Sequence, residues 1–499
     1  MSQKDLLGGK GANLAEMVRI GLPVPPGFTI TTQACREYLH SGQFPTTLIA
    51  EIDAALSDLE KQTGKKFGGV ENPLLVSVRS GAKFSMPGMM ETVLNVGMTP
   101  EVTESLAAST GNARFAWDSY RRFIEMFGKI VCDIEPAEFH KVQERVASSV
   151  GVADIQLFDV EALKLLCDGF KKVISLSTSQ EFPKDPREHL IRSVQAVFKS
   201  WNSERAQMYR RRERIPSDLG TAVNIQSMVF GNLSDDSGTG VAFTRNPSTG
   251  EVGRYGDYLQ RAQGEDVVAG IRTPVSLIEF AVLSPSVAQE LDDVMELLEA
   301  HYEDLCDIEF TVERGKLWIL QTRVGKRTAE AAFRIALQFV DEGKISMDEA
   351  LLRTSGDQLA MLMFPQFDTS GALNEIARGI PASPGAAVGE VVFDSKRAFD
   401  LSKSGKKVIL VRRETSPDDL VGMVASQGIL TSRGGKTSHA AVVARGMGKT
   451  AVCGTDSISV DERASLFTAG AITVYEGDLI SIDGTTGAVY LGDVPVVAS

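Results

Sequence analysis

Residues 428–446, GILTSRGGKTSHAAVVARG, decide the fold of the C-terminal part of this chain. The run 428–431 predicts a buried strand, and the alanine-rich run 438–445 predicts a helix. The glycine pair at 434–435 predicts a tight loop between them. This order of strand, loop and helix places His439 on the first turn of a helix.

His439 is one of five histidines in the 499-residue chain, and its position suits phosphoryl chemistry. A helix N-terminus disfavours the imidazolium, so the ring stays neutral and nucleophilic. Free backbone N–H groups of the loop and first turn can hold a phosphoryl group. A histidine that only caps a helix is the alternative. Because the glycine pair, Thr437 and Ser438 indicate an open, anion-friendly position rather than a packed core, we favour a chemical role.

The composition limits the class of protein and its partners. A chain of this length is sufficient for about two to four domains. Lys+Arg 52 against Asp+Glu 65 gives a formal net charge of -13, which repels nucleic acid and anionic membranes. The five cysteines form no CxxC pair, which argues against a zinc site and a disulfide framework. Without a signal peptide or a long apolar run, the sequence predicts a cytoplasmic protein.

The order of elements predicts an α/β (α+β) fold in two domains joined by helices. The first part of the chain mixes strand-like runs with helical stretches. Residues 328–340 have a helical pattern, and Ser346 with Glu349 matches a capping box that opens a second helix. New strands follow residues 381–385. We therefore predict a first domain at 1–325, a helical connector at 326–378 and a second domain at 379–499.

Residues 306–323, CDIEFTVERGKLWILQTR, predict a hairpin with polar side chains on one face. A three-residue loop at 313–315 ends in a glycine suited to a left-handed position. In that register Asp307 faces Gln321, and Glu309 lies on the same side as Arg323. The predicted opposite, apolar face consists of Ile308, Phe310, Trp318 and Leu320.

The polar face of this hairpin has the composition of a magnesium–polyphosphate site. The hard cation takes carboxylate oxygen, and a guanidinium takes phosphate. An exposed hairpin face with ordinary charges is the alternative. An error of one residue in the register would break the cluster.

A glycine run at residues 8–11, GGKG, precedes a predicted helix near the start of the chain. Glycines allow a phosphate to approach the backbone and Lys10 supplies charge, but the run alone is equally typical of a surface turn. The spacing of a P-loop is absent. Arg79, Arg122 and Arg245 lie beside small or turn-forming residues, and each taken singly is more typical of a solvated or salt-bridged arginine than of a ligand contact.

Together these motifs resemble the pyruvate, phosphate dikinase family. The matching runs extend over nearly the whole chain and their order is specific: LLGGKG at 6–11, SVRSGA at 77–82, SMPGMM at 85–90, GVAFTRNP at 240–247, AQGEDVVAG at 262–270, LQTR at 320–323 and the His439 segment. The SMPGMM run resembles the dikinase branch rather than the related phosphoenolpyruvate synthases.

The resemblance implies an ATP-grasp-like nucleotide-binding domain followed by a swivelling phosphohistidine domain. In the family, ATP transfers a pyrophosphoryl group to the histidine, and orthophosphate cleaves that group to leave phosphohistidine and pyrophosphate. Pyruvate then accepts the phosphoryl group and becomes phosphoenolpyruvate. The resemblance thus implies ATP as substrate and Mg²⁺ as cofactor. A monovalent cation and a homodimer are further expectations of the same kind.

The family pattern also assigns roles to individual residues of this chain. It places His439, Arg79 and Arg323 in catalysis and Arg122 at the orthophosphate. The implied nucleotide and phosphate contacts are Lys10, Arg79, Arg122, Arg245, Glu265, Asp307 and Gln321, and the implied metal ligands are Glu309, Gln321 and Asp307. Thr437 resembles a position that a regulatory kinase phosphorylates in some members, and an ordinary cap residue is an equally supported reading.

Two features depart from the family pattern. Lys436 stands where members usually have methionine, which adds a cation beside the histidine. The chain stops at Ser499, where the family continues into a barrel that binds pyruvate and phosphoenolpyruvate. We therefore expect that barrel to be absent or supplied by a separate protein. A histidine phosphotransferase with another acceptor and a non-catalytic nucleotide-binding regulatory protein stay open as alternatives.

Overall fold

The computed structural model describes residues 3–84, 86, 88–269, 272–361, 366–368 and 373–497. The chain divides into two units, Met1–Val229 and Phe230–Ser499. Each unit contains both helices and sheets, which confirms the predicted mixed α/β class. Among the described residues, no helix combines the length and the apolar character needed to cross a membrane.

The first unit contains a four-stranded antiparallel sheet in the order β1-β6-β4-β5. Helix α1 packs against this sheet with a kink at Gly8, whose φ is +68°. A Cβ at Gly8 would lie 1.6 Å from the carbonyl oxygen of Gly81, so only glycine fits there. The elements of this unit are α1 (Lys4–Arg19), β1 (Gly27–Ile30), α2 (Thr32–Ser41), α3 (Leu48–Thr63), β2 (Lys66–Phe67), β3 (Pro73–Leu74), β4 (Val76–Ala82), β5 (Thr92–Val96), α4 (Pro100–Thr110), α5 (Ala113–Ile130), α6 (Pro136–Val150), α7 (Val160–Thr178), α8 (Pro186–Ser200), α9 (Glu204–Arg212) and β6 (Thr221–Ser227).

The second unit begins with a five-stranded antiparallel sheet in the order β11-β10-β7-β8-β9. One face carries the aromatic rings of Tyr258 and Phe310, which contact Phe280 of α11. The other face carries Phe243 and Tyr255 and packs against α13. The elements of this part are β7 (Gly238–Arg245), β8 (Val252–Gln260), α10 (Gly264–Ala269), β9 (Val275–Ser276), α11 (Leu277–Leu283), α12 (Pro285–Tyr302), β10 (Cys306–Glu313), β11 (Lys316–Val324) and α13 (Ala329–Asp341).

Three helices occupy the segment predicted to be a helical connector. They are α13, α14 (Met347–Arg353) and α15 (Gly356–Met361). Ser346 caps α14 by accepting a hydrogen bond from the amide of Glu349, as the capping motif predicts. The two units divide within the predicted domain 1–325, and the boundaries at 325 and 378 stay predictions.

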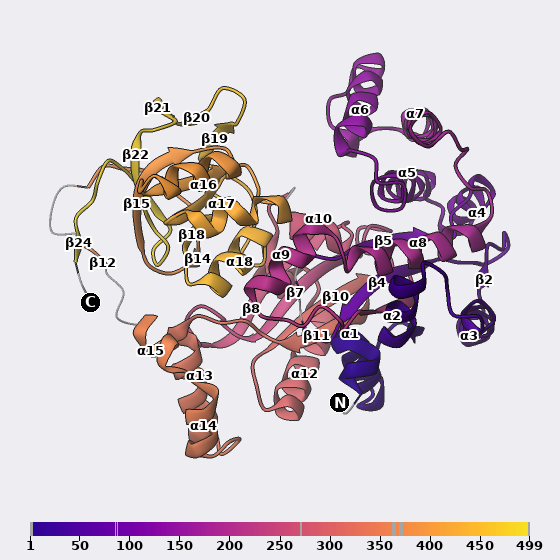
Figure 1. Ribbon diagram of the computed structural model, residues 1–499, viewed down its shortest axis with the longest axis horizontal. Coiled ribbons are helices and arrows are strands. Elements are labelled where there is room, and N and C mark those ends of the chain that lie inside the picture. Colours follow the sequence, from indigo (N-terminus) through magenta and orange to yellow (C-terminus); the bar gives the residue numbers. More distant parts are fainter. Residues whose placement is uncertain are drawn as a thin grey trace. The chain divides into compact units, whose positions relative to one another are not determined.

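The rest of the second unit is built on an eight-stranded sheet in the order β13-β23-β22-β15-β16-β17-β18-β14. Strands β15 to β18 run parallel to their neighbours in that central stretch. Helices α16, α17 and α18 cover one face and the small sheet β19-β20-β21 packs on the other (Figure 1). The elements are β12 (Gln366–Phe367), β13 (Glu375–Arg378), β14 (Ile380–Ser383), β15 (Ala386–Val392), α16 (Ser395–Lys403), β16 (Val408–Arg412), α17 (Leu420–Ala425), β17 (Gly428–Thr431), α18 (His439–Met447), β18 (Thr450–Cys453), β19 (Ile458–Asp461), β20 (Leu466–Ala469), β21 (Ile472–Tyr475), β22 (Leu479–Asp483), β23 (Ala488–Leu491) and β24 (Val496–Val497).

Candidate functional site

The segment around His439 has the predicted strand, loop and helix. Strand β17 ends at Thr431 and α18 begins at His439, with Ser438 as its N-cap. Gly434 has a φ of +99°, which a glycine adopts without strain. The sequence therefore places the imidazole on the first turn of the helix, as predicted.

The His439 side chain is buried, with 7% of its surface exposed. Its Nδ1 lies 3.1 Å from the hydroxyl oxygen of Thr415, and its Nε2 has no hydrogen-bond partner among the described residues. Burial lowers the pKa of His439 to about 4, and the negative charge of Asp418 offsets this only in part. The ring is therefore neutral near pH 7. With Nδ1–H donated to Thr415, the lone pair of Nε2 is available for nucleophilic attack.

The hairpin of β10 and β11 has a different register from the predicted one. Its loop has two residues, Arg314 and Gly315, both with positive φ, as in a type I′ turn. Near this turn the pairing is shifted by one residue, so Leu317 and Ile319 are buried while Trp318 and Leu320 are only partly buried. The predicted places of Trp318 and Leu320 on the apolar face are therefore wrong.

A bulge beside Glu309 restores the predicted polar face at the other end of the hairpin. Asp307 pairs with Arg323, and Glu309 pairs with Gln321. The predicted pairing of Asp307 with Gln321 is wrong by two residues. A shift of two residues keeps side chains on the same face, so all four polar groups still lie together.

Asp307 is the most buried member of this polar face, with 6% of its surface exposed. Its Oδ2 accepts a 2.7 Å hydrogen bond from Nε of Arg323, and its Oδ1 has no hydrogen-bond partner among the described residues. Burial raises the pKa of Asp307, while the Arg323 charge opposes this rise. A buried carboxylate oxygen without a partner favours a bound cation or donor at that position.

The polar face fits a magnesium ion that shares its coordination with a substrate. No group of three or more His, Cys, Asp or Glu side chains suited to a metal occurs in the described part of the chain. Mg²⁺ is commonly held by one or two carboxylates together with phosphate oxygens and water. Asp307 and Glu309 supply two carboxylates, and Gln321 adds an amide oxygen.

The sheet aligns this polar face with the strand that contacts the histidine segment. Glu309 pairs with Val241 of β7, and Val241 pairs with Asp257 of β8. Directly paired residues lie on the same face of a sheet, so Asp257 shares the face of Glu309 at two strand spacings, about 10 Å. Asp257 accepts hydrogen bonds from the Thr437 amide at 3.1 Å and the Thr437 hydroxyl at 2.8 Å. The loop before His439 thus rests on the same face as the candidate metal ligands.

The contact between this loop and β8 is close. A Cβ at Gly435 would lie 2.5 Å from Oδ2 of Asp257, so glycine is needed for the approach. Burial raises the pKa of Asp257, and the Thr437 hydrogen bonds and the Lys436 and Arg445 charges oppose that rise.

In the first unit, Lys10 and Arg79 lie over the same face of the four-stranded sheet. Arg79 and Gly81 alternate along β4 and so lie on the same face. A Cβ at Gly81 would lie 3.3 Å from Cβ of Lys10, which places this part of α1 over that face. Arg79 is paired with Asn224 of β6 in the ladder. The two predicted nucleotide contacts of this unit therefore lie near each other.

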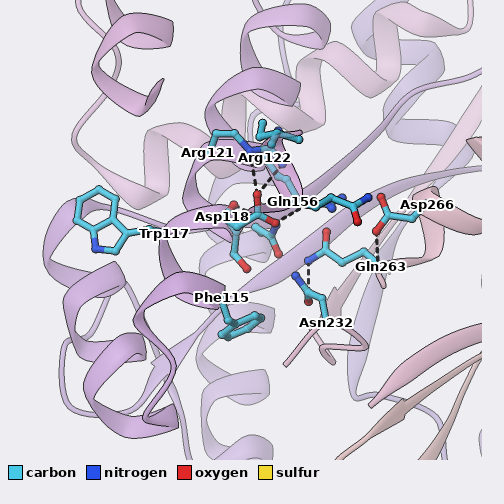
Figure 2. Close-up of polar contacts among 12 residues, drawn as sticks. Phe115, Trp117, Asp118, Arg121, Arg122, Gln156, Asn232, Gln263 and Asp266 are labelled. Carbon is cyan, nitrogen blue, oxygen red and sulfur yellow. Dashed lines mark hydrogen bonds and ion pairs between the residues drawn. The ribbon is translucent and has the colours of Figure 1, made fainter. Parts of the chain in front are cut away.

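Arg122 lies on α5 in a cluster with Arg121 and Asp118 (Figure 2). Asp118 accepts hydrogen bonds from Nε of Arg122 at 2.9 Å and from Nε of Arg121 at 3.0 Å. Burial alone would raise the pKa of Asp118, but the two guanidinium groups hold it well below its usual range. A carboxylate thus positions Arg122, while part of the Arg122 side chain remains exposed.

Arg245 is fully enclosed in a network of its own. Its guanidinium donates to Glu299, Glu342 and Gln338 at 2.7–3.0 Å and lies 4.3 Å from the centre of the Phe339 ring. Only 2% of its surface is exposed. These contacts favour a structural role over the predicted phosphate contact.

The predicted contact Glu265 lies in α10, and its side chain is outside the described residues. The neighbouring Gln263 donates from its backbone amide to Asp266 at 2.9 Å and from its side chain to Asn232 at 3.4 Å (Figure 2). Its buried Oε1 has no hydrogen-bond partner among the described residues. Gln263 is therefore a further candidate for ligand contact in this motif.

Three residues that position the site were missed in the sequence. Thr415 contacts the imidazole, Asp257 holds the loop, and Arg445 donates 2.6 Å and 2.9 Å hydrogen bonds to the carbonyl oxygens of Lys436 and Ala382. Arg445 lies six residues after the histidine on the same helix, α18, so it was within the segment that the sequence singles out. The other two come from distant strands and loops, so no local pattern indicates them.

Two protein families match this chain. Residues 4–43, 36–287 and 278–344 match the family described as "Pyruvate phosphate dikinase, AMP/ATP-binding domain". Residues 405–487, which include His439, match "PEP-utilising enzyme, mobile domain". The pyruvate, phosphate dikinases of Clostridium symbiosum and Rhizobium meliloti (strain 1021) are 51% and 50% identical over 99% of this chain. Pyruvate, phosphate dikinase 1, chloroplastic, of Arabidopsis thaliana is 51% identical over 98% of it.

The chain spans a little over half the length of these relatives, 57%, 56% and 51% respectively. The expectation that the protein lacks the pyruvate-binding barrel, or depends on a separate protein for it, is not borne out. The PEP-utilising mobile domain is present, and the aligned residues account for only part of the relatives' length. With both matched domains in order along its length, the chain belongs to the pyruvate phosphate dikinase family.

Proposed function

We propose that this chain carries out the nucleotide half of a pyruvate, phosphate dikinase reaction, in which ATP phosphorylates His439 and pyruvate is the final acceptor. The observation that supports this most directly is the buried Nε2 of His439, which has no hydrogen-bond partner in the described part of the chain. The loop before this neutral histidine rests on the sheet face of Asp307 and Glu309. The names of the relatives support the choice of substrates.

In the first step, Nε2 of His439 attacks the β-phosphorus of ATP. The bond from Nε2 to phosphorus forms as the bond from that phosphorus to the oxygen shared with the α-phosphate breaks, and AMP leaves. Orthophosphate then attacks the terminal phosphorus of the pyrophosphoryl group, which releases pyrophosphate and leaves phosphohistidine. Thr415 holds the Nδ1–H throughout, so the proton stays away from the attacking nitrogen.

The charged side chains of each unit have distinct roles in this proposal. Asp307, Glu309 and Gln321 hold Mg²⁺, which neutralises charge on the transferred group. Arg323, fixed by Asp307, and the pair Lys10 and Arg79 bind the phosphate oxygens. Arg122, fixed by Asp118, receives orthophosphate.

Thr437 is a second, regulatory candidate within the same segment. Its hydroxyl is bound to Asp257 and only 5% of the residue is exposed, so modification requires the loop to leave β8. A phosphoryl group on Thr437 would face the Asp257 carboxylate and oppose the return of the loop. This electrostatic conflict supports a regulatory role over that of a simple cap residue.

The decisive test is labelling of the protein with ATP that carries a radioactive β-phosphate. The wild type is expected to acquire a label that acid removes, because phosphohistidine is acid-labile and phosphoserine is not. His439→Ala should acquire none and still bind ATP, whereas the control His140→Ala, at an exposed position on α6, should label normally. ATP binding without any label in the wild type would instead favour a nucleotide-binding regulatory protein.

A further inference from the structure

Lys436 makes a second contact between the histidine segment and strand β8. Its ammonium nitrogen lies over the ring of Tyr255, 4.5 Å from the ring centre. Tyr255 is buried in the core against α13, and Lys436 is half-buried. A cation over an aromatic face is attracted by the ring, and the attraction grows when water is excluded.

The surroundings of Lys436 contain one charge that attracts it and one that repels it. Burial lowers the pKa of Lys436, the Asp257 carboxylate opposes that shift, and the Arg445 guanidinium adds to it. Asp257 lies two residues from Tyr255 on β8, on the same face of the sheet. The ammonium group therefore lies over a ring of β8 and is attracted by the charge of a carboxylate on the same strand.

The peptide unit between Lys436 and Thr437 is also held, by one hydrogen bond at each end. The Thr437 amide donates to Asp257 at 3.1 Å, and the Lys436 carbonyl accepts a 2.6 Å hydrogen bond from Arg445 of α18. Asp257 and Tyr255 thus bind the loop from the sheet, while Arg445 binds it from its own helix. If the mobile domain moves, the contacts to β8 break and the contact to Arg445 can persist.

We propose that Lys436 is a positioning residue, and that its contact with Tyr255, helped by the charge of Asp257, shifts the histidine segment toward the arrangement in which it rests on the nucleotide sheet. The proposal extends the proposed function, in which His439 must reach ATP and then a second acceptor. A contact present in only one of two arrangements shifts their equilibrium by its full free energy. Methionine would keep apolar contact with the ring but lose the charge.

The amide of Thr437 provides a direct measurement, because its hydrogen bond ends on β8. Hydrogen exchange at this amide, followed in the full chain without ATP, reports how often the loop leaves the sheet. Lys436→Met is expected to speed this exchange by roughly tenfold, the range of a partly desolvated cation–π contact. Lys436→Gln should do the same, and Lys436→Arg should restore slow exchange because a guanidinium also stacks on the ring.

Lys403→Met is the matched control, since Lys403 lies 4.3 Å from the centre of the Phe399 ring within α16. It should leave exchange at Thr437 unchanged. Unchanged exchange in Lys436→Met, or an equal increase in Lys403→Met, would overturn the proposal. This measurement does not depend on turnover: a wild type that takes no label from ATP contradicts the proposed function, while the exchange rates still decide the role of Lys436.

Discussion

Two buried clusters of arginine and carboxylate in the second unit differ in how completely they are paired. Arg245 has donors bound to Glu299, Glu342 and Gln338, and Lys344 also contacts both glutamates. Asp307 is bound on one oxygen by Arg323, and its other oxygen has no hydrogen-bond partner among the described residues. In the Arg245 cluster the buried charges compensate one another, so removal of one member is costly. In the Asp307 cluster the buried oxygen without a partner among the described residues favours a ligand.

The largest expected effect is a loss of stability when Arg245 is replaced in its cluster with Glu299 and Glu342. Arg245→Met leaves Glu299 and Glu342 without their main partner, and removal of one member of a buried pair costs about 3–5 kcal/mol. Urea unfolding should show this loss in the second unit. The control Arg254→Met removes a more exposed ion pair with Asp292 and should cost about 1 kcal/mol or less. Similar small losses in both variants would show that the Arg245 cluster is not structural.

The cluster of Asp307 and Arg323 should respond in the opposite way: a substitution there should reduce phosphoryl transfer and leave stability nearly unchanged. Because burial raises the pKa of Asp307, the charged form is disfavoured in the ligand-free protein, and Asp307→Asn should leave stability nearly unchanged. Labelling of His439 should fall by roughly 100-fold, since the metal ligand acts on charge that develops during transfer. Glu309→Gln should likewise reduce transfer far more than nucleotide affinity.

The control for this prediction is Glu313→Gln on the same strand, about 20 Å from Asp307 along β10. Glu313 accepts a hydrogen bond from the Phe230 amide and lies at the turn, at the opposite end of β10 from Asp307. It should label at the wild-type rate. Normal labelling in Asp307→Asn with saturating magnesium would remove Asp307 from the site.

The two clusters also show what the sequence could predict. The alternation of Asp307 and Glu309 along one strand was sufficient to predict a shared polar face, because a shift of two residues preserves it. The bulge and the two-residue turn could not be predicted from alternation alone, so Trp318 was placed on the wrong face. The partners of Arg245 come from α12 and from the end of α13, about 50–100 residues away, and no local pattern connects them.

The smallest expected effect concerns His439 and pH. Its pKa is lowered to about 4 in the folded protein, below the unfolded value near 6.5, so the unfolded chain binds more protons between these values. This contribution to stability is complete above about pH 6.5 and is lost as the pH falls toward about 4. Between pH 7 and pH 5 the expected loss is roughly 2 kcal/mol, from about 1.4 kcal/mol for each pH unit below about 6.5.

His439→Gln should remove this part of the pH dependence, which urea unfolding near pH 7 and near pH 5 can measure. Asp257 and Asp307, whose pKa values are raised, contribute slopes of the opposite sign in both proteins. The difference between wild type and variant therefore isolates the imidazole, and His140→Gln on α6 controls for replacement of an exposed one. If the variant and the wild type lost equal stability on acidification, burial would not hold the imidazole neutral. His439 would then not be the neutral nucleophile that the proposed function requires.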